Sequence, residues 1–215
     1  MFWGKGMVKI LGINIIQKNE RTGPMGDMII ANHLGFHEIP VLLSFYPATF
    51  AIKDGAKNVF VTGKALTRTG NIFINMENPM LRTQALFKLI RLLKRGGRII
   101  LFPEGKFTPG SKRQPFNSGS FFAVKRLDKT VEACVIDSPS EREALVWSVN
   151  KKILPQLLDL FGRKKIDISI EFFKPVKVKE EPAVFAKKWQ NIIQKKLEEN
   201  EKESFSRDTG LENVG

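Results

Sequence analysis

The sequence is poor in the residues that cross-link a fold or hold a metal ion. Its 215 residues include one cysteine, Cys134, and two histidines, His33 and His37. A single cysteine excludes an internal disulfide and agrees with a reducing compartment. Two histidines flanking a short loop are too few ligands at an unsuitable spacing, so we expect no metal centre. We also expect no bound cofactor.

Long apolar runs and acidic residues are also scarce. No run approaches the roughly 20 residues that span a bilayer, and residues 1–16 lack the pattern of a secretory signal peptide. The 22 acidic residues are outnumbered by 35 lysines and arginines, which gives a formal net charge of +13. Such a chain attracts nucleic acid, an anionic membrane surface or an acidic carrier protein. Its 42% hydrophobic content excludes general disorder.

Short apolar runs alternate with amphipathic stretches along the chain. This alternation predicts an α/β fold: a single domain with a mixed, mostly parallel sheet flanked by helices. We expect strands at 28–31, 49–52, 72–74, 98–102, 131–136 and 165–173. We expect helices at 39–45, 79–95, 119–126, 140–162 (broken at Pro155) and 182–201.

The predicted domain covers residues 17–203. Residues 1–16 are expected to form either an arm or strand packed on the domain, or a segment lying at a membrane interface with Phe2 and Trp3 as anchors. Residues 204–215 are polar, and we predict a disordered tail.

The most informative stretch is residues 28–40, MIIANHLGFHEIP. An apolar run ends at His33, and a second run begins after Glu38. Because five residues on an ideal helix separate side chains by about 140°, these two meet only if the chain bends, which Gly35 eases. A carboxylate on one ring nitrogen would leave the other nitrogen as a general base. The alternative is a histidine that caps a helix or bonds the backbone.

A second stretch, residues 101–122, reads LFPEGKFTPGSKRQPFNSGSFF. Here a predicted strand runs into a tight turn at Glu104 and Gly105, followed by Lys106, Lys112 and Arg113. Backbone N–H groups, a carboxylate and cations in one loop favour an anion site. An ordinary solvated loop is the alternative.

Together these stretches resemble the glycerolipid acyltransferase family, over about residues 11–176. The family pattern is N-H-x4-D, then G-x-I-F-I-x-R, F-P-E-G-T-R-S and P-F-x-x-G. The matching residues occur in the same order: Asn32-His33-x4-Glu38, Gly70-Asn71-Ile72-Phe73-Ile74, Phe102-Pro103-Glu104-Gly105 and Pro115-Phe116-x-x-Gly119.

The resemblance implies an acyltransferase with the α/β fold of that family. It would move a fatty acyl chain from an acyl thioester, acyl-CoA or acyl-carrier protein, to the free hydroxyl of a lysophospholipid. The first expectation is 1-acylglycerol-3-phosphate, which gives phosphatidic acid. His33 matches the catalytic base, and Glu38 matches its orienting aspartate. Other residues match the acceptor and substrate positions: Glu104, Gly105, Gly70 and Phe73.

Two departures affect the acceptor. Met76 and Phe107 stand where the family has arginines that grip the acceptor phosphate, and neither replaces bidentate binding by arginine. The family also has a motif further along the chain, and the proline usual in that motif is absent near Ala133. Lys106 and Lys53 are candidate phosphate-binding cations in compensation. The alternative is the same chemistry on another lysophospholipid or on a phosphate-free lipid.

The mechanism expected is direct transfer, since Cys134 lies in an apolar strand and is expected in the core. Residues 79–95 and the pair Lys112–Arg113 are candidate basic sites for the membrane or the acyl carrier. We expect a cytoplasmic protein, peripheral on the inner face of the cell membrane. A non-catalytic basic lipid- or nucleic-acid-binding domain is the rival class. Phenylalanines are not interleaved with the basic clusters, which disfavours nucleic acid.

Overall fold

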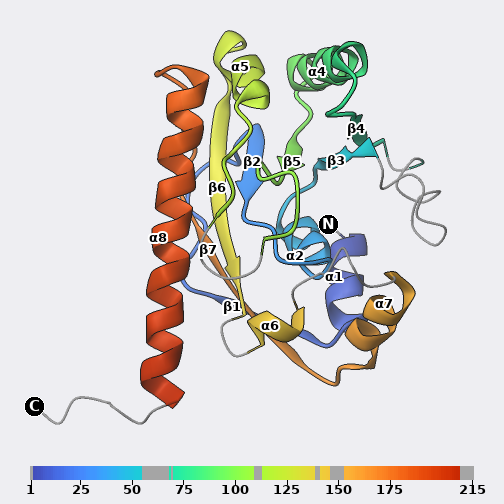
Figure 1. The fold of residues 1–215 in the computed structure, drawn as a ribbon, viewed down its shortest axis with the longest axis vertical. Helices are drawn as coiled ribbons and strands as arrows, with labels where there is room; N and C mark the ends of the chain where they lie inside the picture. Colours follow the sequence, from blue (N-terminus) through green and yellow to red (C-terminus); the bar gives the residue numbers. More distant parts are fainter. Residues whose placement is uncertain are drawn as a thin grey trace, which may run out of the picture.

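The computed structural model describes residues 2–54, 68, 70–108, 113–138, 141–145 and 153–208. Within these residues, eight strands form one sheet in the order β1-β7-β6-β2-β5-β3-β4, and β8 pairs with β6 (Figure 1). The strands are β1 (Ile13–Gln17), β2 (Met28–Ala31), β3 (Thr49–Lys53), β4 (Ile72–Ile74), β5 (Ile99–Leu101), β6 (Thr130–Asp137), β7 (Ile166–Phe172) and β8 (Val176–Lys177). The helices are α1 (Phe2–Ile10), α2 (Glu38–Phe45), α4 (Pro79–Lys94), α5 (Gly119–Arg126), α6 (Arg142–Leu145), α7 (Ile153–Gly162) and α8 (Pro182–Asp208).

The sheet is mixed and mostly parallel, which confirms the predicted α/β class. β2 runs parallel to both β5 and β6, β3 runs parallel to β4 and β5, and β1 runs parallel to β7. β6 is antiparallel to β7 and β8.

The two faces of the sheet bury two apolar clusters, as the alternation of side chains in β2 shows. Met28 and Ile30 point into a cluster with residues of α4, α5 and α8. Ile29 and Ala31 point into a second cluster with residues of α1, α2 and α7. Because β2 is buried on both faces, it reads as a continuous apolar run in the sequence, as expected for a central parallel strand.

One end of the sheet collects several chain segments, and we call it the His33 edge. β2 and β6 finish there at Ala31 and Asp137. Because β7 is antiparallel to β6, β7 begins at the same edge, at Ile166. β1 runs parallel to β7 with Ile13 opposite Ile166, so β1 begins there too.

The predicted strands and helices are present to within two or three residues, apart from the segments described next and the N-terminal helix. The helical segment predicted for 140–162 does not break at Pro155. Pro155 lies in the first turn of α7, where its missing N–H leaves no helical hydrogen bond unmade; residues 146–152 lie outside the described part. β8 was not predicted. α8 continues to Asp208, into the predicted tail, of which residues 209–215 are not described.

The N-terminal segment forms helix α1 and strand β1, and β1 crosses the boundary predicted between arm and domain. Helix α1 contains two glycines, and Gly4 makes its packing possible. A Cβ at Gly4 would lie 2.4 Å from the backbone carbon of Leu43 in α2. Glycine therefore lets α1 pack directly on α2. Within the described residues, no helix combines the length and apolarity needed to cross a bilayer.

Candidate active site

The loop that carries His33 begins at Asn32, whose side chain makes hydrogen bonds to β6 in place of the backbone. Asn32 is fully buried just after β2. Its Nδ2 donates to the carbonyl oxygen of Ile136 at 2.7 Å, and its Oδ1 accepts from the Ile136 N–H at 2.9 Å. These two bonds tie the loop to β6, so the position of His33 is fixed from the first residue after the strand.

The structure brings His33 and Glu38 together. The Nδ1 atom of His33 lies 2.7 Å from Oε2 of Glu38. The other carboxylate oxygen, Oε1, accepts the Leu34 N–H at 2.5 Å. The bend between them depends on Gly35, because a Cβ there would lie 2.5 Å from the carbonyl oxygen of Leu145. The expected bend at Gly35 and the contact between the two side chains are both confirmed.

Two phenylalanines enclose the imidazole. Phe102 stacks on it with ring centroids 3.7 Å apart and planes within 6°. Phe107 lies 4.1 Å away with a tilt of 34°. Two rings this near to the imidazole fit only on opposite faces. With Nδ1 bonded to Glu38 and 13% of the side chain exposed, the Nε2 side of the ring remains for a substrate.

The enclosure changes the protonation of both groups. Burial lowers the pKa of His33 from 6.5 to about 3, because a charged ring would lose its hydration. The negative charge of Glu104 opposes this shift, and the positive charge of Arg113 adds to it. Burial likewise raises the pKa of Glu38 to about 8. The imidazole is therefore held neutral, which is the form that accepts a proton.

Glu104 holds the loop after β5 against the backbone of His33. Its Oε1 accepts the His33 N–H at 3.1 Å and an Nη1 hydrogen of Arg113 at 3.2 Å. Its Oε2 accepts the Gln114 N–H at 3.3 Å. Thr108 donates its N–H to the His33 carbonyl oxygen at 2.8 Å. Glu104 and Arg113 are both buried, so their contacts in the structure position the histidine.

The remaining predicted residues are spread around this centre. Gly105 adopts a φ of 68° in the turn after Phe102, and Lys106 beside it is exposed. Lys53 is exposed at the end of β3. Lys112 lies outside the described residues. The acceptor-binding roles expected of Glu104, Gly105, Lys106 and Lys53 remain predictions.

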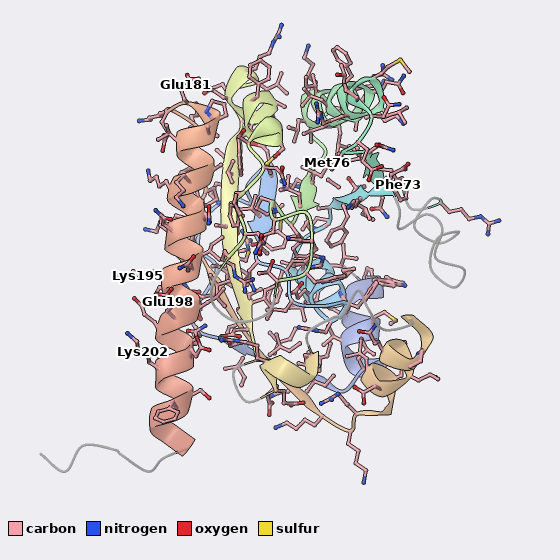
Figure 2. The ribbon with its side chains drawn as sticks, in the orientation of Figure 1. Phe73, Met76, Glu181, Lys195, Glu198 and Lys202 are labelled. Atoms are coloured by element: carbon pink, nitrogen blue, oxygen red, sulfur yellow. The ribbon has the colours of Figure 1, made fainter. Side chains whose placement is uncertain are left out.

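The second motif, which includes Gly70 and Phe73, lies at an edge of the sheet. Gly70, with a φ of 73°, precedes β4, which carries Phe73. Figure 2 shows Phe73 and Met76 at β4, the edge strand that β5 and β3 separate from β2. Met76 is exposed. Gly70 therefore precedes, and Phe73 belongs to, a strand three places away from β2 in the sheet order, and their substrate-binding role remains a prediction.

The structure places four residues at positions in the site that the sequence did not predict: Asn32, Phe102, Phe107 and Arg113. The chemistry of Asn32 gave a partial signal, since its side chain offers both a donor and an acceptor to backbone groups. The other three depend on how the loop at 102–114 folds back. In the part of the chain described, no group of three or more His, Cys, Asp or Glu side chains is arranged to hold a metal ion.

Comparison with known proteins supports the resemblance seen in the motifs. Residues 15–137 match the family model described as Acyltransferase. A 1-acyl-sn-glycerol-3-phosphate acyltransferase of Neisseria gonorrhoeae is 25% identical over 173 residues, which are 79% of this chain and 68% of that protein. A lyso-ornithine lipid O-acyltransferase of Rhizobium meliloti is 20% identical over 190 residues, or 81% of this chain and 65% of that protein.

The fold has a solved counterpart. The crystal structure of a 1-acyl-sn-glycerophosphate acyltransferase from Thermotoga maritima matches with a TM-score of 0.63 and 19% identity. The match covers 92% of this chain and 76% of that one. Since the family match takes in both β2 with its His33–Glu38 pair and the Glu104 loop that holds it, this chain is an enzyme of the acyltransferase family.

Proposed function

We propose that this enzyme transfers a fatty acyl chain from an acyl thioester to the free hydroxyl of 1-acylglycerol-3-phosphate, giving phosphatidic acid. The observation that carries the proposal is the 2.7 Å contact between His33 Nδ1 and Glu38 Oε2 at the end of β2. The names of the relatives from Neisseria gonorrhoeae and Thermotoga maritima support the choice of acceptor.

The pair supports a single displacement. The Nδ1–H of His33 donates to the Glu38 carboxylate, so Nε2 is free to take the proton of the acceptor hydroxyl. The alkoxide oxygen bonds to the thioester carbonyl carbon, and the carbon–sulfur bond breaks. A thiol with a pKa near 8.5 is a good leaving group, and its thiolate takes the proton back from the imidazolium. Glu38 stabilises the charged ring in between.

A covalent acyl-enzyme on cysteine is disfavoured by the surroundings of Cys134. The thiol is fully buried in β6, and its Sγ lies 3.2 Å from the hydroxyl of Tyr46. Burial raises the pKa of Cys134 far above its ordinary value, so the reactive thiolate is not formed. The acyl group therefore goes directly from its carrier, coenzyme A or acyl-carrier protein, to the acceptor.

A second candidate acceptor is a lysolipid without the phosphate. Phe107 stands where the family motif has a phosphate-binding arginine, and its ring lies on the imidazole of His33. Met76 replaces the other expected arginine and is exposed at the edge strand. The Rhizobium meliloti relative is named for a lyso-ornithine lipid acceptor, which supports this alternative.

The place of action proposed is the inner face of the cell membrane, where the enzyme is held peripherally. The acceptor and the product are both membrane lipids. The net charge of +13 favours an anionic lipid surface and an acidic or phosphate-bearing acyl carrier.

The test measures acyl transfer by the purified chain to a panel of acceptors, with acyl-CoA and acyl-carrier protein as donors and products identified by mass spectrometry. The panel contains lysophosphatidic acid, lysophosphatidylglycerol, lyso-ornithine lipid and monoacylglycerol. We expect lysophosphatidic acid to be preferred and His33→Ala to lower the rate about 10³-fold. Lys195→Ala, on the exposed side of α8 (Figure 2), serves as the control. Full activity of His33→Ala overturns the mechanism, and preference for an acceptor without phosphate overturns the assignment.

A further inference from the structure

Five large apolar side chains are exposed on helices α1 and α7. On α1 the exposed fractions are 96% for Phe2, 59% for Trp3 and 67% for Ile10. On α7 they are 63% for Leu158 and 49% for Phe161. A single exposed apolar residue is ordinary, whereas several on neighbouring helices mark an interaction surface. We call these five side chains the α1–α7 face.

The chain segments that follow the two helices lie side by side. α1 leads into β1 and α7 leads into β7, and these strands pair in parallel from Ile13 and Ile166 onward. The Ile166 N–H donates to the carbonyl oxygen of Gly12 at 3.0 Å. A Cβ at Gly12 would lie 2.7 Å from the carbonyl oxygen of Lys164. Figure 1 shows both helices at the same end of the molecule, at the lower right.

This face lies next to the candidate active site. β1 and β7 both begin at the His33 edge of the sheet, as described above. α1 also packs on the last turn of α2, where Gly4 lies against Leu43 and Ser44. Glu38, the partner of His33, begins the same eight-residue helix. A lipid surface that contacts α1 and α7 is therefore presented to the edge of the sheet where the acceptor hydroxyl must arrive.

The charges around the face favour anionic lipid. Lys5 and Lys9 of α1 and Lys164, just after α7, are exposed, and in the described part of the chain none of them is paired with a carboxylate. Asp159, the acidic residue of α7, pairs with Arg163 at 3.2 Å, and Arg163 also pairs with Glu141 at 2.7 Å. Exposed apolar side chains with unpaired lysines beside them are the composition of helices that lie in a membrane interface.

We propose that the α1–α7 face docks the enzyme on an anionic phospholipid membrane, with Leu158 and Phe161 of α7 inserting together with Phe2 and Trp3 of α1. Both helices are short, at 9 and 10 residues, so they lie along the interface and do not cross it. The proposal deepens the proposed function, and rests on it for the statement that the acceptor reaches His33 from the membrane.

Binding is measured by flotation with vesicles of phosphatidylglycerol and phosphatidylcholine, and with vesicles of phosphatidylcholine alone. We expect binding to the mixed vesicles to fall at least 10-fold in Leu158→Ser/Phe161→Ser and in Phe2→Ser/Trp3→Ser. The matched control is Phe87→Ser/Phe122→Ser, which removes exposed phenylalanines from α4 and α5. Circular dichroism melting of each variant shows that it is folded.

Three results overturn the docking proposal: unchanged flotation of the α7 variant, equal loss in the control variant, or equal binding of the wild type to both vesicle types. A separate assay uses a short-chain acceptor dissolved in water, without vesicles. The α7 variant should retain the wild-type rate there. Absence of acyl transfer by the wild type in that assay counts against the proposed function, and leaves the flotation result to decide the docking.

Discussion

The ring of Phe107 covers one face of the His33 imidazole at a centroid distance of 4.1 Å, while Phe102 covers the other at 3.7 Å. The base of the proposed reaction is thus held between two apolar plates. They restrict the rotation of the ring, and they exclude the water that would stabilise its charged form.

Removing one of the two phenylalanine rings should change the pKa of His33. In Phe107→Ala, one face of the ring becomes hydrated, so the pKa of His33 should rise from about 3 towards its usual 6.5. NMR of the imidazole carbon and nitrogen resonances across pH measures this shift. Phe107→Leu, which keeps an apolar cover, is the control. An unchanged titration in Phe107→Ala would show that the ring does not control the protonation of His33.

Replacing the carboxylate of Glu38 should reduce catalysis without unfolding the site. In Glu38→Gln the amide NH₂ facing Nδ1 favours the tautomer that carries its hydrogen on Nε2, where it cannot act as a base. We expect a rate loss of about 10²- to 10⁴-fold, as in other histidine–carboxylate pairs. Glu38→Asp, which has the family's usual residue, should retain more activity. Equal rates for Glu38→Gln and the wild type would refute the pairing as the source of activity.

The pH dependence of acyl transfer follows from the same pair. The reactive form has Glu38 ionised and His33 neutral. Below its pKa, raised by burial to about 8, the protonated carboxyl donates to Nδ1 and leaves a hydrogen on Nε2. The value of kcat/KM should therefore rise steeply from pH 6, reach half of its maximum near pH 8 and level off about one pH unit higher. His33→Ala supplies the uncatalysed background, and a flat profile over this range contradicts the assignment.

The buried ion pair of Glu104 and Arg113 should contribute to the stability of the fold. The side chains are fully buried, so Arg113→Met leaves the Glu104 carboxylate unpaired and should cost about 3–5 kcal/mol in the free energy of unfolding. The double variant Glu104→Gln/Arg113→Met should recover part of that loss. Urea unfolding measures both. A single variant as stable as the wild type would contradict the energetic importance of the buried pair.

Gly4 and Gly6 offer a matched pair for the packing of α1. Gly4→Val places side-chain atoms against the backbone of α2, where a Cβ alone would lie 2.4 Å from Leu43. We expect a loss of about 1–3 kcal/mol, measured by thermal unfolding. Gly6 has nothing within 4 Å of a Cβ position, so Gly6→Ala should be neutral or stabilise the helix by up to about 1 kcal/mol. Equal effects at both positions would contradict the close approach.

Much of this site follows from local rules. The strand before His33, the helix after Glu38 and the bend at Gly35 each have their own sequence signal, and the contact of the two side chains follows from them. The placement of Phe102, Phe107 and Arg113 has no such signal, because it depends on a loop about 70 residues downstream folding back over the histidine. Charge at a sequence position was also a poor guide: Arg113, predicted as part of a basic surface, is buried against Glu104.

The side chain of Asn32 occupies two positions of the hydrogen-bond ladder towards β6. The backbone N–H and carbonyl oxygen of His33 therefore do not pair within the sheet. The N–H donates to Glu104, and the carbonyl oxygen accepts from the Thr108 N–H. A nascent chain that has not yet reached residue 104 lacks every one of these anchors, since Ile136 is also still to be synthesised. The backbone of His33 therefore gains these anchors only after most of the polypeptide has been synthesised and the sheet has formed around it.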